Sequence, residues 1–355
     1  MWAVEILPPP FRPTYGRCQW LATINLGYTP QMRTLVATLT ALMLFATTPV
    51  VAKDLKTLLK SEDQRWSVIG AWKDGSAAFE AGDYQKAVQL WKPLAEQGDA
   101  RTQAMLGRMY YFGEGVPRDY ARAVHWFTKA AKQGSAAAQA MLGRTYYLGE
   151  GVHQDYAKAV HWYTKAAKQG LAIAQFTLGS MHYIGKGVPQ DYAKVVHWYT
   201  KAAKQGHAKA QVNLGRMYDK GENVPQDYDK AVHWHTKAAK QGSAAAQFSL
   251  GGMYGAGREV PKDHAKAFHW FAKAAKQGYL KAQMGISTLY WTGTGVPEDF
   301  VRAYAWASIV AAQGLPSGKE NKKHFSKIMP PAQITEAQKL SRELWEKYVV
   351  PFQKE

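Results

Sequence analysis

One dipeptide, Gln-Gly, recurs at a constant interval of 36 residues through most of this chain. Its seven copies begin at Gln97, Gln133, Gln169, Gln205, Gln241, Gln277 and Gln313. A tryptophan keeps the same interval at Trp126, Trp162, Trp198, Trp234, Trp270 and Trp306. A fixed period of this length is typical of a solenoid, in which each unit buries its apolar face against the next. The period therefore predicts a stack of supersecondary units that serves as a binding scaffold.

Each unit predicts an antiparallel pair of helices. In residues 99–134 the helical spacing of alanine, glycine and tyrosine predicts a first helix over 100–112, and a loop rich in glycine and proline ends it. Asp119 is suited to cap a second helix over 120–133, and Gly134 fits the left-handed position after its last turn.

The second helix of this unit has one small and aromatic face, which we expect to be buried. Its members are Ala123, Trp126, Phe127, Ala130 and Ala131. The first helix carries a glycine, Gly107, and glycine costs a helix about 1 kcal/mol relative to alanine. A glycine at this position in five units indicates close contact between helices.

Two units depart from the pattern in the loop between their helices. Asn223 and Glu259 replace the second loop glycine, which is suited to a positive φ. Asparagine tolerates that conformation, whereas we expect glutamate to cost about 1–2 kcal/mol there unless the loop shifts.

The full pattern, A-x-x-Q-x-x-L-G-x-x-Y-x-x-G-x-G-V-x-x-D-Y-x-K-A-x-x-W-x-x-K-A-A-x-Q-G, resembles the Sel-one-like repeat (SLR), a relative of the tetratricopeptide repeat. Six copies cover residues 99–314, and residues 53–98 are expected to hold N-terminal helices and a degenerate first repeat. The resemblance implies an all-α fold, a right-handed α/α superhelical solenoid. It also implies that the first helix of each pair lines the concave side and that the protein mediates protein–protein interaction without catalysis.

The N-terminal region has the features of an export signal. Residues 32–52 combine a positive residue, an apolar run and small residues ending at Ala52, which predicts a signal peptide starting at Met32. Residues 1–31 show no helical or strand period, and we interpret them as a non-native extension. The expected location is periplasmic or secreted, in a Gram-negative-type bacterium. The alternative is an inner-membrane anchor formed by residues 34–52.

A basic stripe runs along the second helix of five units, with no acidic residue inside the stripe. Its members are Arg122, Lys129, Lys132, Lys158, Lys165, Lys168, Lys194, Lys201, Lys204, Lys230, Lys237, Lys240, Lys266, Lys273 and Lys276. Without residues 1–52 the formal net charge falls from +18 to +18 − 2 = +16, and the fifteen cations of the stripe nearly equal it. The stripe is either a solvated face copied by repeat duplication or a surface for an anionic partner.

The last unit replaces this stripe with apolar residues, Ala305, Ile309 and Ala312 among them. An exposed apolar stripe needs a cover, so residues 315–355 are expected to cap the array. Within this segment, Ser317 and Glu320 have capping-box spacing before a helix over 321–329, and a second helix is expected over 332–348.

On the first helix of each pair, four positions differ from unit to unit while the core positions repeat. A groove lined by these positions and the adjacent tyrosines suits an extended acidic segment of another protein. The candidate binding residues are Arg108, Tyr111, Arg144, Tyr147, Tyr183, Lys209 and Arg216. Drift on a solvated face is the alternative.

No motif predicts catalysis, a metal or a cofactor. The only cysteine, Cys18, precedes the repeats, so neither a disulfide nor a thiolate metal site is available. The histidines at 36-residue spacing (His125, His161, His197, His233 and His269) lie on separate helices between lysines, which disfavours a shared ion. Their aromatic neighbours fit a core better than a nucleic-acid surface. Some relatives of this family are described as β-lactamases, but the Ser-x-x-Lys and Lys-Thr-Gly signatures are absent here.

The sequence thus predicts an exported, non-catalytic scaffold that binds a protein or peptide through the groove of its first helices. The alternative is a cell-envelope attachment factor that holds peptidoglycan, lipopolysaccharide or anionic lipid on the basic stripe. An envelope hydrolase is the remote third candidate.

Overall fold

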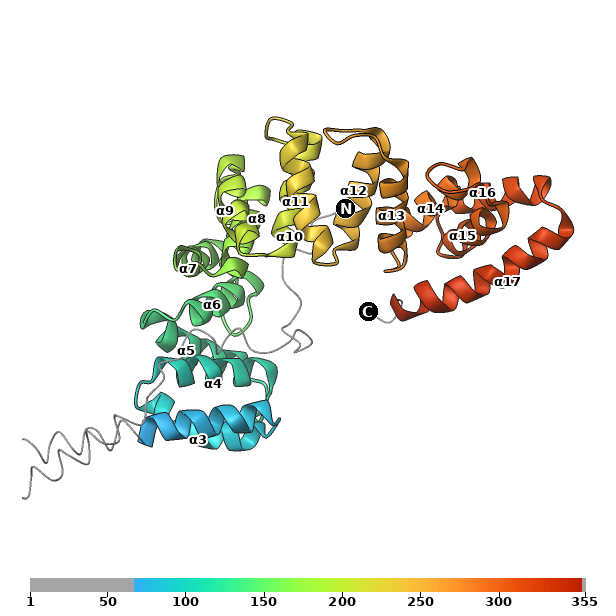
Figure 1. Ribbon diagram of the computed structural model, residues 1–355. Coiled ribbons are helices and arrows are strands. Elements are labelled where there is room, and N and C mark those ends of the chain that lie inside the picture. The colour runs from blue at the N-terminus through green and yellow to red at the C-terminus, as the bar shows by residue number, and fades with distance from the viewer. Residues whose placement is uncertain (1–66, 353–355) are drawn as a thin grey trace, which may run out of the picture. The chain divides into compact units, whose positions relative to one another are not determined.

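The structure, a computed structural model, describes residues 67–352 (Figure 1). The extension, signal peptide and anchor that the sequence predicts within residues 1–52 lie outside the described residues. Every regular element in residues 67–352 is helical, which confirms the all-α prediction. The chain divides into two compact units, residues 1–166 and residues 167–355.

Each repeat contributes two helices, here termed helix A and helix B. Helices A are α4 (Ala100–Phe112), α6 (Ala136–Leu148), α8 (Ala172–Ile184), α10 (Ala208–Lys220), α12 (Ala244–Ala256) and α14 (Leu280–Thr292). Helices B are α5 (Tyr120–Lys132), α7 (Tyr156–Lys168), α9 (Tyr192–Lys204), α11 (Tyr228–Lys240), α13 (His264–Ala275) and α15 (Phe300–Ala312). In the first unit α4 packs against α5 and α5 against α6, and the same alternation runs from α8 to α15 in the second (Figure 1). This consecutive packing defines an α-solenoid.

The helices begin and end at the predicted residues because the signals are local. The Asp119 side chain accepts a hydrogen bond from the backbone N–H of Arg122 at 2.9 Å, which satisfies a donor that the first turn of α5 leaves unpaired. Helix α4 ends at Gly113, whose φ of 74° is left-handed and whose N–H donates to the Met109 carbonyl. Gly134, after α5, also has a positive φ, of 94°.

The predicted close contact at the helix-A glycine is confirmed. A Cβ added to Gly107 would stand 2.5 Å from the ring of Phe127, and the four later copies face their own rings at 2.7–3.1 Å. Phe127 is fully buried, whereas Trp126 is only half-buried. The ring that fills the gap between the helices is therefore the residue after the tryptophan, and the expectation of a fully buried Trp126 is corrected.

Glutamine side chains connect adjacent repeats. Gln241 donates from Nε2 to Oε1 of the buried Gln211 at 2.8 Å, and Gln211 donates to the Ala203 carbonyl at 2.9 Å. Gln133, Gln205, Gln277 and Gln313 make the equivalent 2.8 Å bond to the helix-A glutamine thirty residues earlier. The recurring Gln-Gly therefore supplies a bond within its own repeat in addition to its glycine, and the helix-A glutamine supplies the bond to the preceding repeat.

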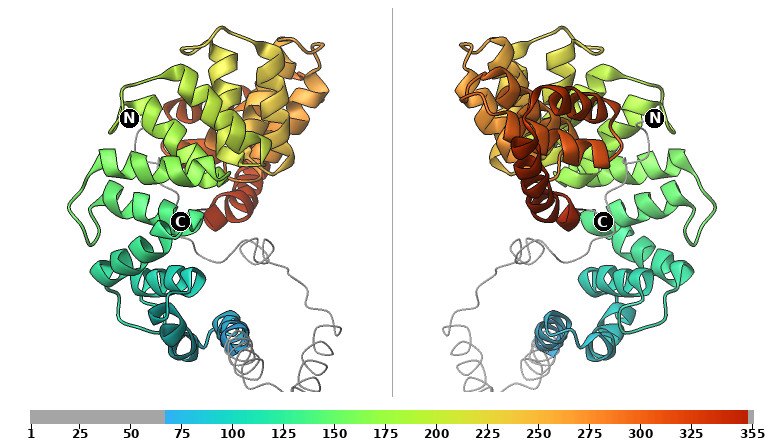
Figure 2. Two further views of the ribbon diagram at one scale, coloured as in Figure 1. Left: turned by 90° about the vertical axis from the view of Figure 1, so that its left-hand side faces the viewer. Right: turned by 90° about the vertical axis from the view of Figure 1, so that its right-hand side faces the viewer.

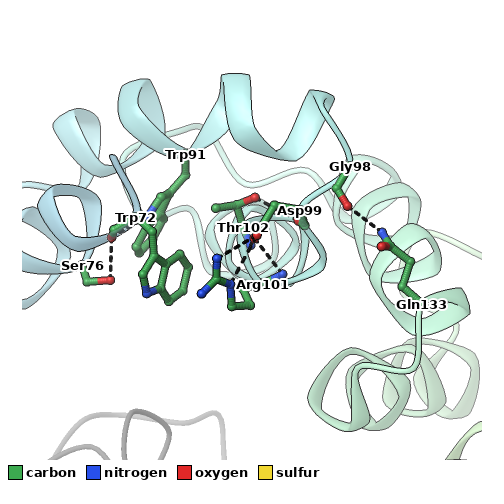
Figure 3. A network of polar contacts seen from close by, with 8 residues as sticks. All are labelled: Trp72, Ser76, Trp91, Gly98, Asp99, Arg101, Thr102 and Gln133. Atoms are coloured by element: carbon green, nitrogen blue, oxygen red, sulfur yellow. Dashed lines mark hydrogen bonds and ion pairs between the residues drawn. The ribbon is translucent and has the colours of Figure 1, made fainter. Parts of the chain in front are cut away.

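Residues 67–80 are helical and pair with α3 (Tyr84–Glu96) ahead of the first full repeat. The buried Trp91 ring stacks on Trp72, with ring centroids 5.4 Å apart. At the following junction Asp99 caps α4, and Gln133 donates to the Gly98 carbonyl at 2.9 Å (Figure 3). The capping and glutamine bonds of the full repeats are thus present at this junction.

Two helices close the C-terminal end of the second unit, α16 (Pro316–Ile328) and α17 (Pro331–Tyr348), followed by a short 3-10 turn (Val350–Phe352). Both pack against α15, where they are drawn in red (Figure 2). Tyr348 stacks on Trp306 with ring centroids 5.9 Å apart, and Ile309 is buried. The apolar stripe of the last repeat is covered at this position, which confirms the C-terminal capping helix.

The predicted capping box at the start of α16 is wrong. The helix begins at Pro316, five residues before the expected start, and its N-cap, Leu315, makes no side-chain hydrogen bond. Proline presets the helical φ and lacks the N–H that a first turn leaves unpaired, so it starts this helix without a capping side chain. Ser317 lies inside the first turn.

Both unusual loop residues adopt the left-handed conformation of the glycines they replace. Asn223 has a φ of 64° and Glu259 a φ of 48°. The loop backbone has therefore not shifted to a conformation with negative φ at Glu259. This residue keeps the expected cost of a left-handed conformation.

Candidate interaction surfaces

In the first unit, two of the proposed groove residues belong to a hydrogen-bonded network between repeats. The Tyr111 hydroxyl bonds to the Glu150 carboxylate, and Nε of Arg144 donates to the same hydroxyl at 2.8 Å. Tyr111 is 4% exposed, and burial, followed by the bond to Glu150, raises its pKa to about 12. The hydroxyl therefore keeps its proton near neutral pH and donates it to Glu150 while it accepts from Arg144. The network connects α4 to α6 and to the loop after α6.

Arg108 makes a similar contact one repeat earlier. Its Nη2 donates to Oε1 of Glu114 at 3.1 Å, and its guanidinium lies 4.6 Å from the ring centroid of Phe79. Tyr147, 7% exposed, packs edge-on against Tyr156. The rings of Tyr111 and Tyr147 thus belong to the core. A loop glutamate holds Arg108, and the Tyr111 hydroxyl holds Arg144.

In the second unit the remaining groove residues are less connected. Nε of Arg216 lies 4.0 Å from Oε2 of Glu222, and Tyr183 packs edge-on against Tyr192 at 5.9 Å. Lys209 is exposed. This arrangement holds Arg216 weakly and leaves Lys209 in solvent.

The sequence reasoning missed the glutamates that accompany these arginines. Glu114, Glu150 and Glu222 each follow an arginine of helix A by six residues. This spacing is visible in the sequence, but it spans a helix end and a loop, so no helical period detects it.

An apolar surface on the helix-A side of the first unit lies beside these arginines. We name it the A-face patch; its members occupy equivalent positions on α4 and α6, two helices in contact, and all are half-buried. They are Met105, Phe112, Met141 and Leu148. At the equivalent positions α10 carries Asn213 and Lys220, so the patch is confined to the early repeats.

All fifteen members of the basic stripe are exposed. The member in the first turn of each helix B is nevertheless paired with the aspartate that caps that helix. Lys230 Nζ, for example, lies 2.7 Å from Oδ2 of Asp227, and the four equivalent pairs measure 3.0–3.3 Å. The stripe itself contains no acidic residue, but the capping aspartates thus partner five of its fifteen cations.

These contacts lower the pKa of four of the capping aspartates. The pKa of Asp155, Asp191 and Asp263 is lowered, first by the backbone N–H of the lysine three residues later. At Asp227 the side chain of Lys230 is the first cause of the lowered pKa. Exposed pairs of this kind contribute little to stability, because solvent screens the charges.

The middle member of the stripe lies over the tryptophan of its own helix. Lys129 Nζ is 4.8 Å from the Trp126 ring centroid, and the four equivalent distances are 4.7–5.1 Å. The last member lies in the final turn, where a cation complements the helix dipole. Local chemistry thus accounts for every position of the stripe.

The predicted histidine row forms no shared site. Each histidine packs edge-on against the tryptophan that follows it, as His125 does against Trp126 at 5.2 Å. Within residues 67–352 no group of three or more His, Cys, Asp or Glu side chains is placed to hold a metal ion. The same stretch contains no helix with the length and apolarity needed to cross a membrane.

These features define an α-solenoid repeat protein. A model of the Sel1 repeat family matches residues 74–99, 100–135, 136–171, 172–207, 208–243, 244–279 and 280–315. The chain belongs to the Sel1 repeat family. No curated protein matches the chain.

Among solved structures, a Sel1 repeat protein from Oxalobacter formigenes is 32% identical, with a TM-score of 0.59; the alignment covers 68% of this chain and 99% of that one. A protective antigen with an SLR fold from uropathogenic Escherichia coli is 28% identical over 84% of this chain and 88% of its own, with a TM-score of 0.33. A putative Sel1 repeat protein from Klebsiella pneumoniae is 24% identical over 56% and 97%, with a TM-score of 0.36. Sel1 repeat proteins are in general non-catalytic scaffolds that bind other proteins.

Proposed function

We propose that this protein binds a segment of another protein on the A-face patch of its first unit. The observation that carries the proposal is the set of methionines, leucine and phenylalanine at matching positions of α4 and α6, which are only half-buried. Unbranched, polarizable methionine side chains adapt to a partner's shape, and aromatic anchors contribute much of the energy of an interface. The preformed helices reduce the ordering cost of binding.

The adjacent arginines favour a partner with acidic groups beside its apolar anchors. Nη2 of Arg108 donates a hydrogen bond to Glu114. A guanidinium has five N–H donors, so others are left for a partner. A carboxylate of the partner would add charge-assisted hydrogen bonds at the edge of the patch. The partner class is therefore a peptide segment with apolar anchors flanked by acids, and no cofactor takes part.

The test is site-specific photocrosslinking of the full-length protein in the cells that make it. The photoreactive p-benzoylphenylalanine replaces Phe112 in the A-face patch or, as a control, His161 on the exposed side of α7. We expect a discrete crosslinked protein from position 112 and none from position 161. Equal crosslinking from both positions, or none from position 112, would refute the proposal.

The basic stripe supports a second function, attachment to an anionic envelope polymer. Its ten middle and last-turn lysines make no ion pair with another described residue, and all face solvent. Attachment of this kind weakens steeply with salt, because the screening length falls from about 10 Å at 0.1 M to about 3 Å at 1 M. Binding to purified cell-wall material that persists at high salt would contradict this alternative.

The export signal predicted at residues 32–52 would place both activities outside the cytoplasm. Mass spectrometry of the mature N-terminus tests this location. A first peptide that starts at Lys53 supports export with cleavage after Ala52, whereas peptides from within residues 34–52 support the anchor.

A further inference from the structure

Helix α16 continues the repeat as a seventh helix A, but it carries exposed lysines at positions that are buried in the earlier repeats. Its first residue, Pro316, lies 36 residues after the first residue of α14. In that register Lys322 occupies the position at which the six earlier helices A carry a fully buried residue. Those residues are Leu106, Leu142, Leu178, Leu214, Leu250 and Ile286.

Two neighbouring core positions are also lysines in α16. Lys319 replaces the buried glutamine that joins adjacent repeats, and Lys323 replaces the residue that packs against the helix-B ring. Gly318 and Phe325 remain buried, so the same face of α16 still points toward α15. All three lysines are nevertheless exposed, because no following helix covers their side of α16.

The helix B that should cover this face is missing. In the second unit each earlier helix A packs against the helix that follows it, but α17 packs against α15 and leaves α16 without such a partner. Leu344 and Tyr348 of α17 join the cluster around Trp306. The position beside the lysines of α16 is left open.

A shallow surface cavity of about 500 Å³, open to solvent, occupies this position. It is lined by Ser308, Ala311, Ala312, Lys319, Lys322, Lys323 and Ser326. Lys322 Nζ lies 5.9 Å from the ring centroid of Tyr304, a buried residue of α15. The Ser308 hydroxyl oxygen is buried, and it makes no hydrogen bond with the described residues.

The charges of this cavity are unbalanced. Three exposed lysines line it, and none of them forms an ion pair with a carboxylate among residues 67–352. Each ammonium has three N–H donors, and the unpartnered hydroxyl can add a fourth polar contact. Hydrogen bonds between cations and oxyanions are about twice as strong as neutral ones.

We propose that the cavity between α15 and α16 binds a small polyanion through its phosphate or carboxylate groups. Its volume lies within the range of about 300–1,000 Å³ that is typical of small-molecule sites. Lys322 provides the central cation, Lys319 and Lys323 flank it, and Ser308 donates its hydroxyl. This site is independent of the A-face patch.

Isothermal titration calorimetry of the full-length protein tests the proposal, with inorganic pyrophosphate and citrate as probes. Pyrophosphate binding alone identifies a phosphate site, citrate binding alone a carboxylate site, and binding of both a general oxyanion site. We expect Lys322→Gln to weaken the favoured probe about tenfold, the effect of about 1.4 kcal/mol. Ser308→Ala should weaken it severalfold.

Two further variants make the result decisive. Lys327→Gln removes the same charge from an exposed position of α16 outside the cavity, and it should change the affinity less than twofold. Lys322→Leu restores the residue of the earlier repeats, so it should abolish binding while the melting temperature is kept or raised. Equal losses in Lys327→Gln and Lys322→Gln, or no binding of either probe by the native protein, would overturn the proposal.

Discussion

Replacement of His235 by phenylalanine should stabilise the protein and remove part of its sensitivity to acid. His235 is 1% exposed and occupies the helix-B ring position that is Phe or Tyr in four other repeats. Its ring packs on Gly215, where an added Cβ would stand 2.7 Å from Cε1. Neither ring nitrogen makes a hydrogen bond with the described residues.

Burial lowers the pKa of His235 to about 4, from an ordinary value of 6.5. The unfolded chain therefore binds a proton between these values while the fold does not, so stability is full above pH 6.5 and falls toward pH 4. Each pKa unit corresponds to about 1.36 kcal/mol, which makes the loss about 3 kcal/mol at pH 4. The unpaired nitrogens add a desolvation cost of about 1–3 kcal/mol at every pH.

The assay is urea unfolding of the native protein and His235→Phe at about pH 7.5 and about pH 4.5. We expect the variant to be more stable by about 1–3 kcal/mol at the higher pH and by a larger margin at the lower. His207 also has a pKa lowered to about 4, first by burial, and it caps α10 through Nδ1. His207→Ser keeps a capping side chain, as at Ser135. This variant measures the part of the acid sensitivity that comes from His207.

The reasoning is refuted if His235→Phe gains nothing at the higher pH and loses as much stability as the native protein on acidification. Hydrogen exchange locates the effect. Amide protection should rise first in α11 and in α10, the helix that packs against it.

Three further changes test the local physics by chemical or thermal unfolding. Glu259→Gly removes the side chain at a φ of 48° and should stabilise the fold by about 1 kcal/mol. Asn223→Gly should change stability little, because asparagine tolerates this conformation. Equal effects would contradict the strain argument. Gly107→Ala places a Cβ 2.5 Å from a buried ring and should cost about 1–3 kcal/mol, while Gly252→Ala, with open space around it, should gain about 1 kcal/mol. Deletion of 316–355 uncovers the last repeat and should cause aggregation or loss of cooperative unfolding; an unchanged melting transition would refute the capping role.

The contacts made by the groove residues and by the basic stripe could be predicted from the sequence only in part. Arg144 and Tyr111 were expected side by side, and they are, but as partners of Glu150 in a bond between repeats. The sequence contained this pairing only as a six-residue interval, which has no meaning until the loop folds over the preceding helix. Likewise, the capping aspartates were recognised, yet their ion pairs with the stripe were not.

The sequence by itself determined the helix pairs, their ends and the period of the array, because caps, left-handed glycines and apolar spacing act within a few residues of chain. Tertiary structure alone decided which side chains meet across repeats, such as Tyr111 with Glu150, and which aromatic ring fills each gap. It also decided that α17 covers α15 and leaves the lysines of α16 beside an open cavity. These contacts join residues about thirty or more positions apart, and only the stacking of the hairpins brings them within reach of one another.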